Sequence, residues 1–116
     1  MSNDIMALQH LDGTSVVGTL LLNTAEDGTF TCNWQDYGTL IFAIGNYNNI
    51  RETLTCPRNV FRGFSSGSRI LISPNMSAST VYSVEIYPSG EGAITVTGLN
   101  TLASVYTNYR LRVFGL

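Results

Sequence analysis

The chain has 116 residues and a formal net charge of −2 at pH 7, and only 12% of its residues are charged, well below the ~25% that is usual in globular proteins. The length fits one domain with one hydrophobic core. All six basic residues are arginines scattered along the chain, which argues against nucleic acid as a partner, and no run of about 20 apolar residues is available for membrane insertion.

The N-terminal residues 1–4 (Met-Ser-Asn-Asp) lack the basic region and apolar stretch of a secretory signal peptide, so we expect synthesis in a cytosol. A cytosolic start favours free, buried thiols at Cys32 and Cys56 over a disulfide, although one bridge between them stays open as an alternative.

Short apolar segments recur about every ten residues and are separated by Gly, Asn, Asp, Ser or Pro, a pattern typical of sandwiches and barrels. The first segment, residues 5–8, is compatible with a strand or with a short helical lead-in. Residues 39–44 are the most apolar and are expected to run through the centre of the core. Further strands are predicted at residues 16–22, 29–32, 50–55, 60–64, 69–73, 80–87, 93–97 and 108–114. Loops are predicted at residues 33–38, 45–49 and 100–107.

These segments amount to about nine strands. We therefore predict an all-β fold, an antiparallel two-sheet sandwich, of which the jelly roll is one form. Ser, Thr, Asn and Gly supply most of the polarity, which suits strands and tight turns better than helices. We expect residues 1–14 to form a leader segment and residues 15–116 to form a single β-sandwich domain.

Several segments share a pattern with one known protein family. Residues 109–116 (Tyr-Arg-Leu-Arg-Val-Phe-Gly-Leu) close the chain with a strand in which a basic residue is followed by apolar, aromatic, Gly and apolar residues. In residues 34–44, aromatic residues precede Leu-Ile-Phe. In residues 52–61, a predicted strand is followed by proline and then by Val-Phe. Residues 92–96 have the sequence Gly-Ala-Ile-Thr-Val. From about Leu20 to Leu116, the chain thus resembles the C-terminal domains of bacteriophage tail-fibre and minor tail proteins.

The resemblance implies a receptor-binding head at the distal end of a fibre. Such a head is a homotrimer that contacts a glycan or protein on the host-cell surface, beside other virion proteins. It implies localisation in the virion after synthesis in the host cytoplasm. The chain departs from the usual case because almost no shaft or coiled-coil segment precedes the domain, so an isolated domain or a compact virion protein is expected.

Residues suited to catalysis are few. His10 is the single histidine, and no Gly-x-Ser-x-Gly elbow accompanies it. Carboxylates such as Asp27 and Glu91 lie in predicted turns, where acids commonly bind the backbone. The spacing of the two cysteines fits no metal motif. We therefore expect no enzymatic activity, no cofactor and no metal site.

Aromatic residues in predicted loops are the best candidates for binding. Sugars stack their C–H faces on aromatic rings while amides and carboxylates bind the hydroxyls. The candidate ligand-binding residues are Trp34, Asp36, Tyr37, Asn46, Tyr47, Asn48 and Tyr106; the last forms a second group with Asn108 and Tyr109. In the structural alternative, Trp34 plugs one end of the sandwich and the tyrosines pack against loops; in a third interpretation these aromatics lie in a subunit interface.

The leading hypothesis is therefore a phage fibre or tail-tip domain that binds a host-surface receptor, a glycan above all, as a trimer. One alternative is a structural virion protein, such as a capsid decoration protein, without a ligand. The other is a stand-alone, lectin-like carbohydrate-binding module.

Overall fold

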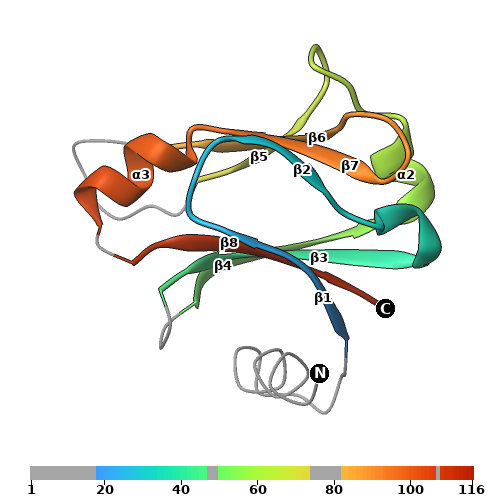
Figure 1. Ribbon diagram of the computed structural model, residues 1–116, viewed down its shortest axis with the longest axis horizontal. Helices are drawn as coiled ribbons and strands as arrows, with labels where there is room; N and C mark the ends of the chain where they lie inside the picture. The colour runs from blue at the N-terminus through green and yellow to red at the C-terminus, as the bar shows by residue number, and fades with distance from the viewer. Residues whose placement is uncertain (1–17, 47–49, 74–81, 107) are drawn as a thin grey trace.

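The computed structural model describes residues 18–46, 50–73, 82–106 and 108–116. Its strands are β1 (Thr19–Thr24), β2 (Gly28–Thr31), β3 (Thr39–Gly45), β4 (Ile50–Pro57), β5 (Ile70–Ile72), β6 (Val84–Pro88), β7 (Ala93–Thr97) and β8 (Arg110–Gly115). One four-stranded sheet has the order β1-β8-β3-β4, and a second has the order β2-β7-β6-β5. The two antiparallel sheets pack face to face, which confirms the predicted all-β sandwich (Figure 1).

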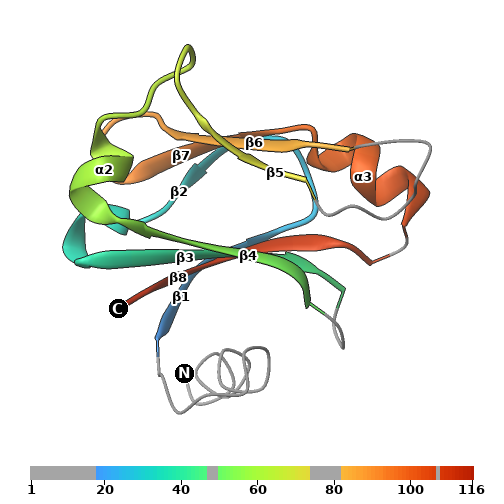
Figure 2. The same cartoon turned by 180° about the vertical axis from the view of Figure 1, so that it is seen from behind.

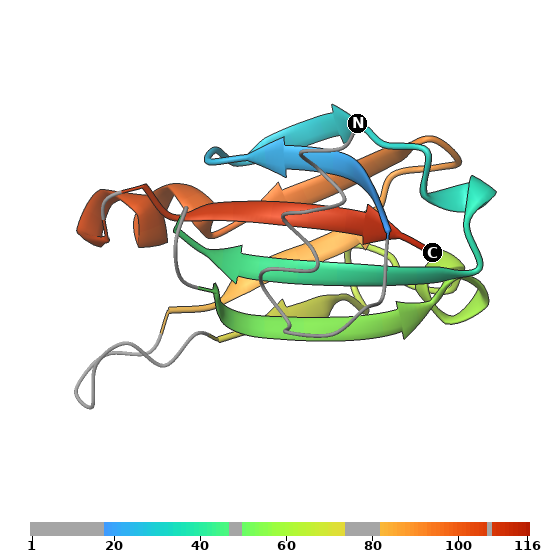
Figure 3. The same ribbon diagram turned by 90° about the horizontal axis from the view of Figure 1, so that it is seen from below.

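The order of the strands matches a jelly roll only in part. A jelly roll is a long hairpin rolled into two sheets, so its first strand pairs with its last and the second with the seventh. The pairs β1–β8 and β2–β7 are present here. In contrast, β3 pairs with β4 and β5 pairs with β6, each with its neighbour in sequence. The last strand, β8, pairs with both β1 and β3 and therefore lies between them inside its sheet (Figure 3).

Alternation along the strands builds the core between the sheets. In β3, Leu40, Phe42 and Ile44 are fully buried and belong to the main cluster, as the apolar run 39–44 predicted. On the other face of the same sheet, Ile41 of β3 and Phe114 of β8 are register partners in a second, smaller cluster. The central strand therefore has buried apolar residues on both of its faces.

The predicted strand at residues 60–64 is wrong. Residues Arg58–Arg62 form a helix, α2, directly after Pro57. Phe61 is fully buried and its ring packs edge-on against Phe64, whereas Val60 is 51% exposed. A strand would have put Val60 and Phe64 on the same face, away from Phe61. Contacts three residues apart, as between Phe61 and Phe64, instead fit a helical turn.

The predicted loop at residues 100–107 is also wrong in part, because Leu99–Val105 form a helix, α3. Leu99 and Leu102 are buried three residues apart on one face of this helix. The carboxylate of Asp27 caps the start of α3, since its oxygens accept hydrogen bonds from the backbone N–H groups of Gly98 (3.1 Å), Leu99 (2.7 Å) and Asn100 (2.9 Å). This confirms that an acid in the 26–28 turn binds the backbone.

The remaining predicted elements agree with the structure to within a few residues. Predicted segment 93–97 coincides with β7. The strands predicted at 16–22 and 80–87 correspond to β1 and β6, and the first two residues of each prediction lie outside the described residues. The described residues form eight strands rather than about nine. The predicted segment 5–8 and the leader 1–14 lie outside the described residues. Within those residues, no helix is long and apolar enough to cross a membrane.

Short helices mark the two ends of the sandwich. The 3-10 helix η1 (Trp34–Asp36) and α2 lie at one end, whereas α3 lies at the other (Figure 1; Figure 2). Since β3 runs from Thr39 to Gly45 between these ends, residues before and after it in sequence are separated by the length of the sheet. This separation decides which of the candidate binding residues can act together.

Candidate functional site

Trp34 is part of the core rather than of an exposed site. Its side chain is 1% exposed, and its ring packs edge-on against Phe61 at 5.2 Å between ring centroids. Its indole N–H donates to the carbonyl oxygens of Gly90 (3.3 Å) and Ala93 (3.1 Å). The buried ring therefore offers no exposed face on which a sugar could stack, and the side chain packs inside the end of the sandwich where η1 and α2 lie.

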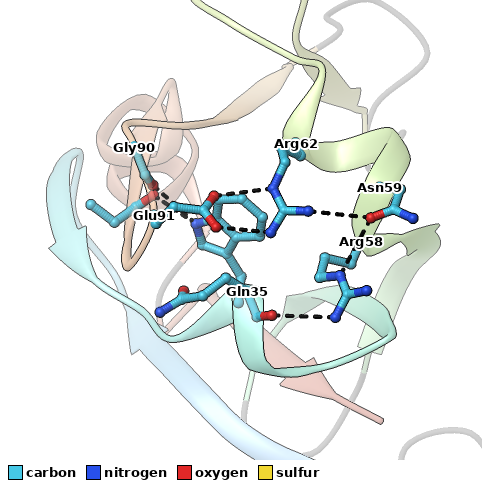
Figure 4. A network of polar contacts seen from close by, with 8 residues as sticks. Gln35, Arg58, Asn59, Arg62, Gly90 and Glu91 are labelled. Atoms are coloured by element: carbon cyan, nitrogen blue, oxygen red, sulfur yellow. Dashed lines mark hydrogen bonds and ion pairs between the residues drawn. The ribbon is translucent and has the colours of Figure 1, made fainter.

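An ion pair covers the outer side of Trp34 (Figure 4). The guanidinium of Arg62 lies 5.3 Å from the centroid of the Trp34 ring, and its Nη2 donates to Glu91 Oε1 at 2.8 Å. The hydrogen bond from Arg62 is the main cause that holds the pKa of the Glu91 carboxyl below its usual value. Arg62 also donates to Asn59. The side chains of Arg62, Glu91 and Asn59 are thus occupied by one another.

Tyr37 lies at the same end, just after η1, in a half-buried position. Its ring packs directly over Gly115, where a Cβ atom would overlap the ring. The backbone of Leu116 fixes this arrangement, because its carbonyl oxygen accepts hydrogen bonds from the N–H groups of Gly38 (3.0 Å) and Thr39 (3.3 Å). The neighbouring candidate Asp36 is exposed at the surface of η1.

A pocket of about 300 Å³ opens beside Tyr37. It lies between the start of β1 and the end of β2, which are edge strands of the two sheets. Its lining combines one aromatic ring, one amide, two hydroxyls and apolar side chains. The lining residues are Thr19, Leu20, Leu21, Thr31, Cys32, Asn33 and Tyr37. Such a mixture, with a few polar groups on an apolar wall, is typical of small-ligand sites.

Cys32 contributes a neutral surface to this pocket. Burial raises the pKa of its thiol from 9.0 to about 12, against a smaller lowering by the backbone hydrogen bond of Trp34. Both Cys32 and Cys56 are free and buried, as the sequence predicted. A thiol with so high a pKa is uncharged near neutral pH and is a poor nucleophile.

The other candidate residues lie at the opposite end of the sandwich, near α3. Tyr106 follows α3, is half-buried, and contacts the rings of Tyr82 (6.1 Å between centroids) and Tyr109 (5.5 Å). Asn46 follows β3, and its carbonyl oxygen accepts a hydrogen bond from Arg112 at 3.4 Å. Tyr47 and Asn48 lie outside the described residues.

The predicted site residues therefore do not form one group. Tyr37 and Asp36 lie at the η1 end, whereas Asn46 and Tyr106 lie at the α3 end. Sequence reasoning also missed Thr19 and Thr31 in the pocket wall, because both lie in strands and only the pairing of distant segments brings them to Tyr37. No signal in a single sequence marks such a junction.

Among the residues that the structure describes, no group of three or more His, Cys, Asp or Glu side chains is placed to hold a metal ion. Comparison with known proteins identified no matching protein family, no matching curated protein and no matching solved structure.

Proposed function

We propose that this protein is a non-enzymatic, saccharide-binding β-sandwich, and that the pocket beside Tyr37 holds the sugar. The observation that carries the proposal is the lining of that pocket, which combines a tyrosine ring, the amide of Asn33 and the hydroxyls of Thr19 and Thr31 in a space of about 300 Å³. A pyranose ring offers apolar C–H faces for the aromatic ring and hydroxyls for the amide and the threonines.

The pocket is suited to a ligand whose position must be well defined. Gly115 lies against the Tyr37 ring, so this ring has little freedom to move away from the pocket. Rigid aromatic groups bind with little loss of conformational entropy. Asn33 is exposed and carries its amide at the rim, which supports a role in contacting hydroxyls.

Binding in this pocket should depend neither on a divalent cation nor on pH between about 5 and 8. None of the described residues that line it carries a carboxylate or an imidazole, and the Cys32 thiol titrates only near pH 12. Addition of EDTA, or a change of pH within this range, should leave the dissociation constant of a bound glycan unchanged. A calcium-dependent sugar site would lose its ligand in EDTA.

The test is binding of the purified protein to an array of bacterial surface polysaccharides, followed by titration of the strongest hit. Asn33→Ala should weaken binding roughly tenfold through the loss of ligand hydrogen bonds. Tyr37→Ala should weaken it further. Matched controls are Asn59→Ala on α2 and Tyr87→Ala on β6, which lie outside the pocket lining and should bind as the parent does.

Two results would contradict this proposal. The first is an array on which no polysaccharide binds the protein above background. The second is a hit whose affinity is the same in the parent and in Asn33→Ala, because Asn33 is exposed and its replacement should not disturb the fold.

On the resemblance to phage tail proteins, we further propose that the protein is the trimeric head of a fibre or tail tip and binds a glycan of the host surface. Only 12% of the residues are charged, which supports assembly into an oligomer. Burying a surface with few charges between subunits costs little desolvation free energy. Light scattering on a sizing column should give a mass of about three chains. A clean monomer would contradict the trimer and favour a free-standing carbohydrate-binding module.

A further inference from the structure

Three tyrosine rings meet at the α3 end of the sandwich, remote from the pocket beside Tyr37. Tyr82 precedes β6, Tyr106 follows α3, and Tyr109 precedes β8. The Tyr106 ring lies 6.1 Å from that of Tyr82, nearly perpendicular to it, and 5.5 Å from that of Tyr109. Tyr82 and Tyr106 are half-buried, so this tyrosine cluster reaches the surface, whereas Tyr109 is 4% exposed and anchors it to the core.

A cation is held against this cluster. Arg51, at the start of β4, donates from Nε to the hydroxyl of Tyr109 at 3.0 Å. Because the bond uses Nε, the two Nη groups of the exposed guanidinium are left for another acceptor. The planar fork of an arginine binds a carboxylate with two parallel hydrogen bonds.

A second arginine beside a tyrosine is already neutralised. Arg69 lies 5.9 Å from the centroid of the Tyr87 ring, and its Nη1 is 2.6 Å from Glu85 Oε1. Arg62, over Trp34, is paired with Glu91 in the same way. Among the described residues, no carboxylate lies within ion-pair distance of Arg51. The guanidinium beside the tyrosine cluster is thus oriented by Tyr109 but has no anionic partner within the part of the chain that the structure describes.

Hydroxyl-binding groups complete this surface. Asn108 is exposed in the turn between Tyr106 and Tyr109, where its φ of 67° places it in the left-handed region that asparagine tolerates. Its amide and the phenolic hydroxyls of the half-buried Tyr82 and Tyr106 can bind a ligand rich in hydroxyls. An apolar peptide would leave these groups without partners.

We propose that the Arg51–tyrosine cluster is a second binding site, specific for a saccharide that carries a carboxylate, such as a uronic or sialic acid. The sugar ring stacks on Tyr106 and its carboxylate pairs with Arg51. This inference goes beyond the proposed function because it concerns the opposite end of the molecule and a charged class of ligand, and it stands whether or not the pocket beside Tyr37 binds a sugar.

The experiment compares two probes that differ only in the acid group: methyl β-D-glucuronoside and methyl β-D-glucoside, titrated at low salt by isothermal calorimetry. The parent should bind the glucuronoside about tenfold more tightly, as expected for a charge-assisted pair. Arg51→Gln should abolish that preference. Arg69→Gln is the matched control, an arginine that also lies beside a tyrosine, and should retain it.

Further variants separate this site from the pocket. Tyr109→Phe removes the hydroxyl that orients Arg51 and should reduce the preference without abolishing it. Asn33→Ala should leave the preference intact. Equal binding of the two probes by the parent, or a preference that survives Arg51→Gln, would overturn the inference. Loss of the preference in Asn33→Ala would overturn it too, by placing the acid in the pocket, and would leave the proposed function standing.

Discussion

The side chain of Trp34 is held from two sides, by the apolar ring of Phe61 and by the guanidinium of Arg62. Replacing Trp34 with alanine is expected to lower the free energy of unfolding by about 3–5 kcal/mol, since it removes a fully buried ring and leaves a cavity. Urea denaturation measures this change. Val60→Ala on α2, where the side chain is 51% exposed, should stay within about 0.5 kcal/mol of the parent. A Trp34→Ala variant as stable as this control would show that the ring is not a core residue.

The buried thiol of Cys32 makes stability depend on pH above neutrality. The unfolded thiol loses its proton near its ordinary pKa of 9.0, whereas the folded thiol keeps it up to about pH 12. The unfolded state therefore binds fewer protons between these values, and the contribution of Cys32 to stability falls as pH rises, by at most about 1.4 kcal/mol per pH unit. Urea denaturation between pH 8 and 11 should show a steeper decline for the parent than for Cys32→Ala. Equal slopes would contradict this account.

At the residue scale, the chemical role of a side chain was easier to predict from sequence than its solvent exposure. Free, buried thiols were expected at Cys32 and Cys56, and the backbone role of Asp27 was expected from its place in a turn. The exposure of Trp34 could not be predicted, because a tryptophan next to polar residues is compatible with an exposed ring that binds a ligand and with a buried ring that closes one end of the sandwich. The contacts of Trp34 with Phe61 and Arg62 of α2, more than twenty residues later in the chain, decide between these two possibilities.

At the scale of elements, α3 depends on a cap that comes from a distant turn. Three backbone N–H groups at its start donate to Asp27, and the helix is only seven residues long. Asp27→Ala should lower the free energy of unfolding by about 0.5–2 kcal/mol, the usual cost of losing a helix cap. Asp36→Ala, which removes an exposed carboxylate from η1, is the matched control for thermal unfolding and should be close to neutral. Equal melting temperatures for the two variants would contradict the capping role.

Helices α2 and α3 were the elements that sequence reasoning missed, for physical reasons that differ. Val60, Phe61 and Phe64 offer enough apolar residues for a strand, and β-branched and aromatic types favour one. In α3, Asn100, Thr101 and Ser104 are poor helix formers, so propensity predicted a loop. The spacing of Leu99 and Leu102 was the available helical signal, but two residues are too few to establish a period.

At the scale of the whole molecule, the fold class was readable and the topology was not. Turn signals at regular intervals indicate a sandwich whichever strands pair. Whether β4 stays beside β3 or crosses to the other sheet depends on contacts between segments far apart in sequence. The same long-range arrangement separates Tyr37, which follows η1, from Asn46, which follows β3, although the sequence had placed both in one group of candidates.

The position of β8 has a consequence for how the protein is made. This strand is the only described partner of β1 and the second partner of β3, yet it comes last in sequence. Until residues 110–115 leave the ribosome, the apolar strand β3 keeps one open edge. The first sheet therefore closes only after translation of β8. A nascent chain stalled before Arg110 should depend on chaperones and should aggregate when released without them.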